Sequence, residues 1–379
     1  MNPADFHAPS AGRVVQAPGG FAAFIPAPLP PELTYEGTLV LALSRADAAL
    51  SELSGLGRQL PNPHLLIAPY MRREAVLSSR IEGTRTSLSD LLRDEVEVER
   101  TQDADTQEVR NYVTAMEYGL GRLRELPLSL RLVREMHERL MRGVRGDQAT
   151  PGEFRTSQNW IGPAGSTPAT APYVPPPPQE MMEALANWES FLHQRERFPD
   201  LVQCALMHEQ FEAIHPFLDG NGRVGRLLIT LFLVERGRLT QPLLYLSDYI
   251  ESHRQQYYDS LQRVRTEGDW SGWLHFFLVG VEETARAAVR QAGGLMDLRE
   301  TYRQRLGRKP NALKLLDELF VNPYITAARA VRVLGVSGPT ARHAIALLQE
   351  EGVLGEMTGR SWGRIYLARP ILQAIEARA

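Results

Sequence analysis

The sequence is poor in cysteine: Cys204 is the only one among 379 residues. One cysteine cannot form a disulfide within the chain, and it cannot build a zinc site from several thiolates. We therefore expect the protein to work in a reducing compartment.

Long apolar runs are also lacking. The longest ones, residues 227–234 and 276–281, fall far short of the roughly 20 residues that span a bilayer. The N-terminus does not read as a signal peptide, because charges come early and prolines interrupt the apolar stretch at residues 20–31. These features predict a soluble, cytoplasmic protein that does not bind membranes.

The chain has little excess charge of either sign. It carries 42 basic and 45 acidic residues, a net charge of −3. This balance excludes a surface that is basic all over and binds nucleic acid through charge alone. Hydrophobic residues make up 43% of the chain, which at this length predicts two or three domains.

Composition and helical spacing of apolar residues divide the chain into five parts. The first is an extended arm with seven prolines, and the third and largest is an all-α core. In order, we expect an arm at residues 1–36, a helical region at 37–125, a core at 126–295, a linker at 296–309 and a small domain at 310–379.

The stretch IHPFLDGNGRVGRLL, residues 214–228, concentrates polar residues and glycines between two predicted helices. Pro216 disfavours helical geometry at His215, so the first helix should end with the imidazole at its edge. The run from Gly220 to Gly222 allows successive backbone N–H groups to converge on an anion at the start of the next helix. The helix dipole attracts negative charge to the same place.

Two arginines and one carboxylate accompany this loop. Arg223 and Arg226 lie three residues apart in the first turn of the second helix, where a polyphosphate would compensate their charge. Asp219 would repel that phosphate unless a hard cation lay between them, and Mg²⁺ is the natural choice. The pattern predicts a base, a metal carboxylate and a phosphate site.

Two other interpretations compete with this one. In the first, the stretch is a structural corner in which His215 caps a helix and Asp219 pairs with Arg223. In the second, His208, His215 and Asp219 form a metal hydrolase site, although the seven-residue spacing of the histidines does not match the compact H-E-x-x-H pattern.

The segment HPFLDGNGRVGR, residues 215–226, resembles the signature of Fic-domain proteins, HPFx(D/E)GNGRxxR, at every defined position. The resemblance extends over the N-terminal helical region, the core and a C-terminal winged helix. It implies a protein adenylyltransferase that moves AMP from ATP to a hydroxyl of a target protein.

The resemblance also implies a role for each residue of the motif. His215 would be the general base, and Asp219 would hold Mg²⁺ on the α and β phosphates of ATP. The other residues would bind phosphates: Gly220, Asn221 and Gly222 by cradling them, and Arg223 and Arg226 at the β and γ groups. Positioning and electrostatics supply most of the catalysis in such chemistry.

An upstream segment, SSRIEG, contains Ser78, Glu82 and Gly83. At helical spacing Ser78 and Glu82 share a face, and Gly83 can end the helix. On position alone Glu82 could equally be an ordinary solvated glutamate. The segment resembles the Fic inhibitory motif (S/T)xxxE(G/N), which implies that Glu82 pairs with Arg226 and excludes the γ phosphate from its productive position.

A long interruption at residues 147–179 is rich in proline, glycine, serine and threonine. Its strand-forming residues predict a hairpin around a turn-rich centre: Trp160, Ile161, Tyr173 and Val174. By resemblance this flap would pair its edge with an extended segment of the target protein. The alternative is a surface loop without a binding role.

Tyr257 and Tyr258 form an aromatic pair in a predicted amphipathic helix. The resemblance implies that a ring here faces adenine, and we assign Tyr257 to the ATP site. Aromatic pairs on such helices are more often core residues.

The C-terminal part predicts three helices and a hairpin, an order that resembles a winged helix-turn-helix. Residues 309–379 carry nine basic and six acidic residues. Several polar residues would face outward and could contact a DNA groove or phosphates: Thr340, Arg342, His343, Gln349, Arg360 and Arg364. Fold alone does not establish DNA binding, so protein recognition or dimerisation stands beside it.

The sequence therefore predicts an all-α protein with a Fic-type core, a short β-hairpin flap and a C-terminal winged helix-turn-helix. The predicted activity is transfer of AMP from ATP to Ser, Thr or Tyr of target proteins and of the chain itself, with Mg²⁺ and with inhibition by Glu82. One alternative is a Fic protein that transfers another phosphate-containing group or removes AMP. Another is an ATP-sensing, DNA-binding regulator. The target and a homodimeric state stay open.

Overall fold

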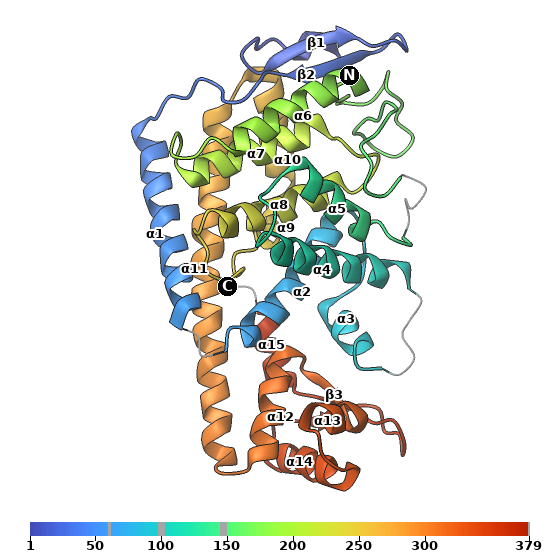
Figure 1. The fold of residues 1–379 in the computed structure, drawn as a ribbon, viewed down its shortest axis with the longest axis vertical. Helices are drawn as coiled ribbons and strands as arrows, with labels where there is room; N and C mark the ends of the chain where they lie inside the picture. The colour runs from blue at the N-terminus through green and yellow to red at the C-terminus, as the bar shows by residue number, and fades with distance from the viewer. Residues whose placement is uncertain (60–61, 98–102, 145–149, 378–379) are drawn as a thin grey trace.

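The computed structural model describes residues 1–59, 62–97, 103–144 and 150–377. Its body is helical, and its strands form small antiparallel sheets at opposite ends of the molecule (Figure 1). The predicted all-α class is confirmed. Within the described ranges, no helix is both long enough and apolar enough to cross a membrane.

The N-terminal segment is more ordered than the predicted extended arm. After a short 3₁₀ helix, η1 (Pro3–Asp5), the strands β1 (Gly12–Gln16) and β2 (Ala22–Pro26) pair in antiparallel register. All five residues of β2 are buried. This strand comes from the apolar stretch that prolines interrupt, and it pairs with β1 along one edge. Along its other edge, the N–H of Phe24 donates to the carbonyl of Val174 at 2.9 Å.

The first group of helices surrounds the core, and side-chain caps explain several of its boundaries. Ser87 and Asp90 form a reciprocal capping box at the start of α3, and Asp103 caps α4. The helices are α1 (Gly37–Gln59), α2 (His64–Ile81), α3 (Leu88–Asp94), α4 (Ala104–Arg122) and α5 (Leu130–Leu140).

The second group contains the two central helices. All residues of α7 from Leu201 to Ile214 are buried, and α8 packs against α7, α2, α4 and α5. Such a helix, enclosed on every side, is typical of a protein core. The bounds are α6 (Pro178–Leu192), α7 (Asp200–Ile214), α8 (Asn221–Glu235), α9 (Ser247–Ser252) and α10 (Arg254–Glu267).

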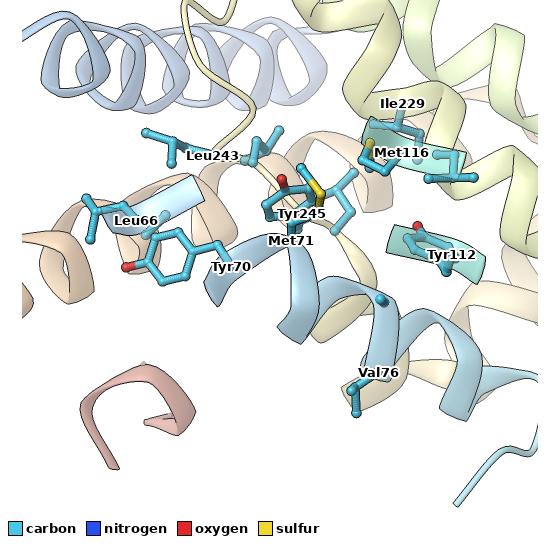
Figure 2. Packing of buried hydrophobic residues seen from close by; sticks show 14 of the residues in the cluster. Leu66, Tyr70, Met71, Val76, Tyr112, Met116, Ile229, Leu243 and Tyr245 are labelled. Atoms are coloured by element: carbon cyan, nitrogen blue, oxygen red, sulfur yellow. The ribbon is translucent and has the colours of Figure 1, made fainter. Parts of the chain in front are cut away.

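Apolar side chains fix α2 against this centre. Figure 2 shows Leu66, Tyr70, Met71 and Val76 of α2 with side chains of α4, of α8 and of the segment after α8. The further residues labelled there are Tyr112, Met116, Ile229, Leu243 and Tyr245. The helix that carries the predicted inhibitory motif is thus part of the core.

Helix α11 (Trp270–Leu306) joins the core to the C-terminal region. Its 37 residues extend for about 55 Å, and it lies along α1 (Figure 1). Residues 296–306 of the predicted linker form its last turns, because no helix-breaking residue intervenes before Gly307. The buried side chains of Tyr302 and Leu306 hold this end in place.

The C-terminal region contains the three predicted helices and the predicted pair of strands. An additional strand, β3, joins them in a sheet of order β3-β5-β4, and a final helix follows. The elements are α12 (Pro310–Val321), β3 (Tyr324–Thr326), α13 (Ala327–Leu334), α14 (Gly338–Glu350), β4 (Gly355–Glu356), β5 (Ile365–Leu367) and α15 (Arg369–Glu376). The winged-helix class and a nucleic-acid partner stay predictions.

A buried asparagine links this region to α3. The Asn322 amide donates to the carbonyl of Leu92 at 2.9 Å and to Glu95 Oε2 at 3.1 Å. Its Oδ1 accepts the N–H of Tyr324 at 2.9 Å. Asn322 is fully buried, so each of these bonds replaces one that water would otherwise make.

We expect Asn322→Ala to lower the free energy of unfolding by about 2 kcal/mol, because it leaves buried backbone groups unpaired. Urea titration followed by circular dichroism measures the change. Gln304→Ala, at an exposed position of α11, is the control and should have little effect. Equal stability of the two variants would contradict the docking role of Asn322.

Candidate active site

The central feature of the site is the end of α7. The helix ends at His215, whose backbone is in the left-handed conformation with φ 50° and ψ 61°. This agrees with the expectation that Pro216 stops the helix there. The imidazole is partly exposed, and its Nδ1 is buried without a hydrogen-bond partner in the described chain.

Two residues from the long interruption hold this strained turn. Arg155 Nε donates to the carbonyl of His215 at 3.0 Å. The backbone N–H of Arg155 donates to the carbonyl of Pro216 at 2.9 Å. The Asn159 amide donates to the carbonyl of Phe217 at 2.8 Å. Neither role was predictable, since nothing in a loop sequence indicates which distant carbonyls its side chains reach.

His137 on α5 fixes the next part of the loop. Its Nδ1 accepts the N–H of Gly152 at 2.9 Å, so its Nε2 carries the proton and donates to the carbonyl of Asp219 at 3.0 Å. Its ring stacks on Phe217 with centroids 3.7 Å apart. Burial is the main reason that the pKa of His137 falls to about 4, which keeps this bridging ring neutral. The role of His137 was not predictable from the sequence either.

The glycine-rich turn leads directly into α8. Gly220 has φ 78°, and the side chain of Asn221 both accepts from the N–H of Phe217 and donates to its carbonyl, at 2.8 Å each. The Asn221 side chain therefore closes the loop and is not available to a ligand. A phosphate cradle at this point would consist of the backbone N–H groups that open the first turn of α8, at Asn221, Gly222 and Arg223.

The two arginines of the motif are buried in different surroundings. Arg223 donates to Glu108 at 3.2 Å, and its Nη2 lies 3.6 Å from Asp219 Oδ1. Its Nε has no partner in the described chain. Arg226 donates from Nε to Ser78 Oγ at 2.8 Å and from Nη2 to the carbonyl of Ser78 at 2.9 Å.

Glu82 completes the coordination of Arg226. Glu82 lies just after the last residue of α2, Gly83 follows with φ 103°, and Arg226 Nη2 donates to Glu82 Oε1 at 2.7 Å. Burial disfavours the charged carboxylate, but Arg226 outweighs it and holds the pKa of Glu82 below its usual range. The structure thus brings Ser78, Glu82 and Arg226 together as the inhibitory motif implies.

The position of Glu82 depends on Gly222. A β-carbon at Gly222 would lie 2.4 Å from Glu82 Oε1, which is too close for a real contact, and at a tight 3.0 Å from Arg226 Nη1. The carboxylate therefore rests directly on the first turn of α8. That is where the helix dipole and the free N–H groups favour an anion.

Asp219 is the candidate metal ligand. Its Oδ1 accepts the N–H of Gly220 at 2.6 Å, and half of its side chain is exposed. In the described residues, no cluster of three His, Cys, Asp or Glu side chains could hold a metal by itself. The donor set fits Mg²⁺ that takes its other ligands from nucleotide phosphates and water. The side chains of His208, His215 and Asp219 do not form the metal site of the alternative hydrolase.

The electrostatic surroundings keep His215 neutral. Burial and then the positive charges of Arg155 and Arg265 lower the pKa of His215 to about 3. The imidazole is therefore neutral at physiological pH, which is the form that can accept a proton.

Tyr257 does not line the site in this structure. Its ring is 1% exposed, and its hydroxyl lies 2.9 Å from His208 Nε2. His208 Nδ1 lies 3.1 Å from the carbonyl of Gly225 and must donate to it, so Nε2 accepts from Tyr257. The predicted contact of Tyr257 with adenine is therefore replaced by a core role. Tyr258 is 41% exposed, and Glu82 and Arg226 are among the charges that act on its hydroxyl.

The predicted flap is reduced to one β-bridge between Ile161 and Tyr173, with N–H to carbonyl distances of 2.9 and 3.4 Å. Trp160 is 42% exposed, whereas Tyr173 and Val174 are buried. The Tyr173 hydroxyl donates to the carbonyl of Ala213 at 2.7 Å. Only the Trp160 side of the flap is therefore open to a partner, because on the other side the carbonyl of Val174 accepts the N–H of Phe24 in β2. Residues 147–149 of the interruption lie outside the described residues.

Comparison with known families agrees with this geometry. Residues 40–121 match the family described as "Fic/DOC family N-terminal", and residues 127–233 match "Fic/DOC family". Residues 40–121 and 127–233 thus match the N-terminal part and the main part of the Fic/DOC family.

Curated relatives match over a similar region. "Protein adenylyltransferase Fic" of Aedes aegypti is 33% identical over 159 residues, which cover 41% of this chain and 28% of the relative. "Probable protein adenylyltransferase" of Aquifex aeolicus is 32% identical over 190 residues, which cover 48% and 54%. The chain thus spans between about a quarter and about a half of the length of these relatives.

Solved structures share the fold. A Fic family protein from Desulfovibrio desulfuricans has a TM-score of 0.58 at 21% identity, covering 89% of this chain and 98% of its own. A Fic domain containing signaling protein from Bacteroides thetaiotaomicron has a TM-score of 0.50 at 16% identity, covering 68% and 97%. The Fic-type architecture predicted from the motif is confirmed.

We expect His137→Phe to loosen the motif loop while keeping the ring stacked on Phe217. Losing both hydrogen bonds of the imidazole should cost about 2 kcal/mol of stability and speed hydrogen exchange of the amides of residues 217–221. Mass spectrometry of exchanged peptides measures this, with the exposed His275→Phe on α11 as the control. Unchanged exchange in the loop would show that His137 does not hold it.

Proposed function

We propose that the chain is a protein adenylyltransferase, which transfers AMP from ATP to a Ser, Thr or Tyr hydroxyl of target proteins and of itself. The observation that supports this best is the position of the neutral His215 beside the start of α8, where free N–H groups and Arg226 gather. The printed names of the curated relatives support the same activity.

In this proposal the target hydroxyl oxygen attacks the α phosphorus of ATP. The bond from that phosphorus to the bridging oxygen breaks, and pyrophosphate leaves. His215, which is neutral throughout the physiological range, accepts the hydroxyl proton. Arg155 and Asn159 act on this step by holding the backbone of the turn that presents the imidazole.

The N–H groups of the first turn of α8 and the two arginines would bind the phosphates. Arg223 would contact the β phosphate and Arg226 the γ phosphate, each through a charge-assisted pair. Mg²⁺ bound at Asp219 would supply charge compensation for the phosphates. Tyr258 is the exposed member of the aromatic pair and is the better candidate for contact with adenine.

The flap offers a place for the target backbone. Because Ile161 uses its N–H and carbonyl for Tyr173, the backbone groups of Trp160 and Gly162 point to the opposite edge. An extended target segment would pair there and bring its hydroxyl toward His215.

Glu82 would inhibit the enzyme by occupying the guanidinium that the γ phosphate needs. Its carboxylate lies 2.7 Å from Arg226 and above Gly222, so a productive γ phosphate and Glu82 exclude each other. An enzyme that transfers another phosphate-containing group or removes AMP, and an ATP-sensing DNA-binding regulator, are the alternatives.

Incubation with ATP labelled in the adenine ring tests the activity, and we expect covalent label on protein. His215→Ala should keep ATP binding but lose at least about 100-fold in transfer rate, because the lost base cannot be replaced by water at the same position. His193→Ala, an exposed histidine at the end of α6, is the matched control. Transfer at the normal rate in His215→Ala would reject the assigned base.

The outcome also separates the alternatives. Label from the γ phosphate rather than adenine would indicate transfer of another group. ATP-dependent affinity for DNA without covalent label would favour the regulator.

We expect Glu82→Gly to raise adenylylation about 10- to 1,000-fold at saturating ATP, because the γ phosphate no longer competes for Arg226. The double variant Glu82→Gly, Arg226→Ala should lose this gain. Glu267→Gly is the matched control, since Glu267 also precedes a left-handed glycine at a helix end. Label incorporation at equal protein and ATP measures the effect, and no gain in Glu82→Gly would remove the inhibitory role.

A further inference from the structure

A cavity of about 240 Å³ lies between α2, α9 and α11, outside the motif loop. Tyr70, Arg73, Glu74 and Leu77 contribute one wall, and their spacing puts them on one face of α2. The volume is below the roughly 300–1,000 Å³ that is typical of drug-sized sites, so it suits a small molecule. The proposed catalytic function does not use this cavity.

Two buried tyrosine hydroxyls in the lining have no partner. Tyr70 is 5% exposed and Tyr245 is 8% exposed, and neither hydroxyl has a hydrogen-bond partner in the described chain. Figure 2 shows both rings, with Leu243, which also lines the cavity. Buried hydroxyls are normally bonded, so each of these two lacks a partner that a ligand group could supply.

The side chains that line the cavity include more acidic than basic residues. The positive charge of Arg73 is already used, because it lies 2.6 Å from Asp248 and also donates to Gln291 at 3.0 Å. Glu283 at the exposed rim has no such cationic partner in the lining. Tyr249 lines the cavity together with Glu283, and burial and then the charge of Glu283 raise the pKa of Tyr249 to about 12.

A carboxylate in a cavity lined by tyrosines is a surrounding that stabilises an organic cation, through charge pairing and through contact with aromatic side chains. We propose that this cavity binds a small organic ammonium compound, with the ammonium group near Glu283 and Tyr249 and the apolar body along Leu77 and Leu243. A polar group at the far end of the ligand would bond to the hydroxyls of Tyr70 and Tyr245.

Calorimetric titration of the full chain with tyramine tests the proposal, with tyrosol, in which a hydroxyl replaces the ammonium group, as the neutral comparison. We expect tyramine to bind at least about tenfold more tightly than tyrosol. Glu283→Gln should weaken tyramine binding about tenfold, whereas Glu282→Gln should not. Glu282 is the adjacent residue on α11, pairs with Arg286 and does not line the cavity.

Three results would overturn the proposal: no heat with tyramine, equal affinity for tyrosol, or equal loss in the two glutamine variants. The last would indicate diffuse electrostatic attraction.

Tyr70→Phe and Tyr245→Phe remove only hydroxyls and should each weaken binding several-fold without a drop in melting temperature. Hydrogen exchange gives an independent readout, because tyramine should slow exchange of the α2 amides around Tyr70 to Leu77, and unchanged exchange would also contradict binding here.

Discussion

The arrangement of the site depends on one buried guanidinium. Arg226 is 3% exposed and cannot lose its charge, so the protein must surround it with acceptors. Ser78 supplies two of these and Glu82 a third, all from α2 or its end. The consequence is a direct bond between the first turn of α8 and the end of α2. Any anion that enters the site has to compete with that bond.

Around this cation, the neighbouring titratable rings are kept neutral. His137, His208 and His215 all have lowered pKa values, and burial is the largest cause in each case. The positive potential at the start of α8 therefore comes from arginines and the helix dipole, which do not titrate near neutral pH. Before it accepts a proton, His215 is neutral and adds no charge to the anion site.

Much of the site was accessible from the sequence because its residues are neighbours in the chain. His215, Asp219 and Arg226 lie within one segment, and a proline and glycines there specify the turn. Arg155 and His137 were not accessible, since they reach the loop only after the fold brings distant segments together. The N-terminal hairpin and the burial of Tyr257 were missed for a related reason: tertiary contacts decided whether those residues became covered.

The contact between Gly222 and Glu82 links two positions that are 140 residues apart in the chain. A side chain at position 222 would expel the carboxylate, and a shorter residue at position 82 would remove the reason for a glycine at that close approach. During evolution these positions are therefore not free to change independently. Relatives that replace the glycine should therefore show a relaxed choice of residue at the glutamate position.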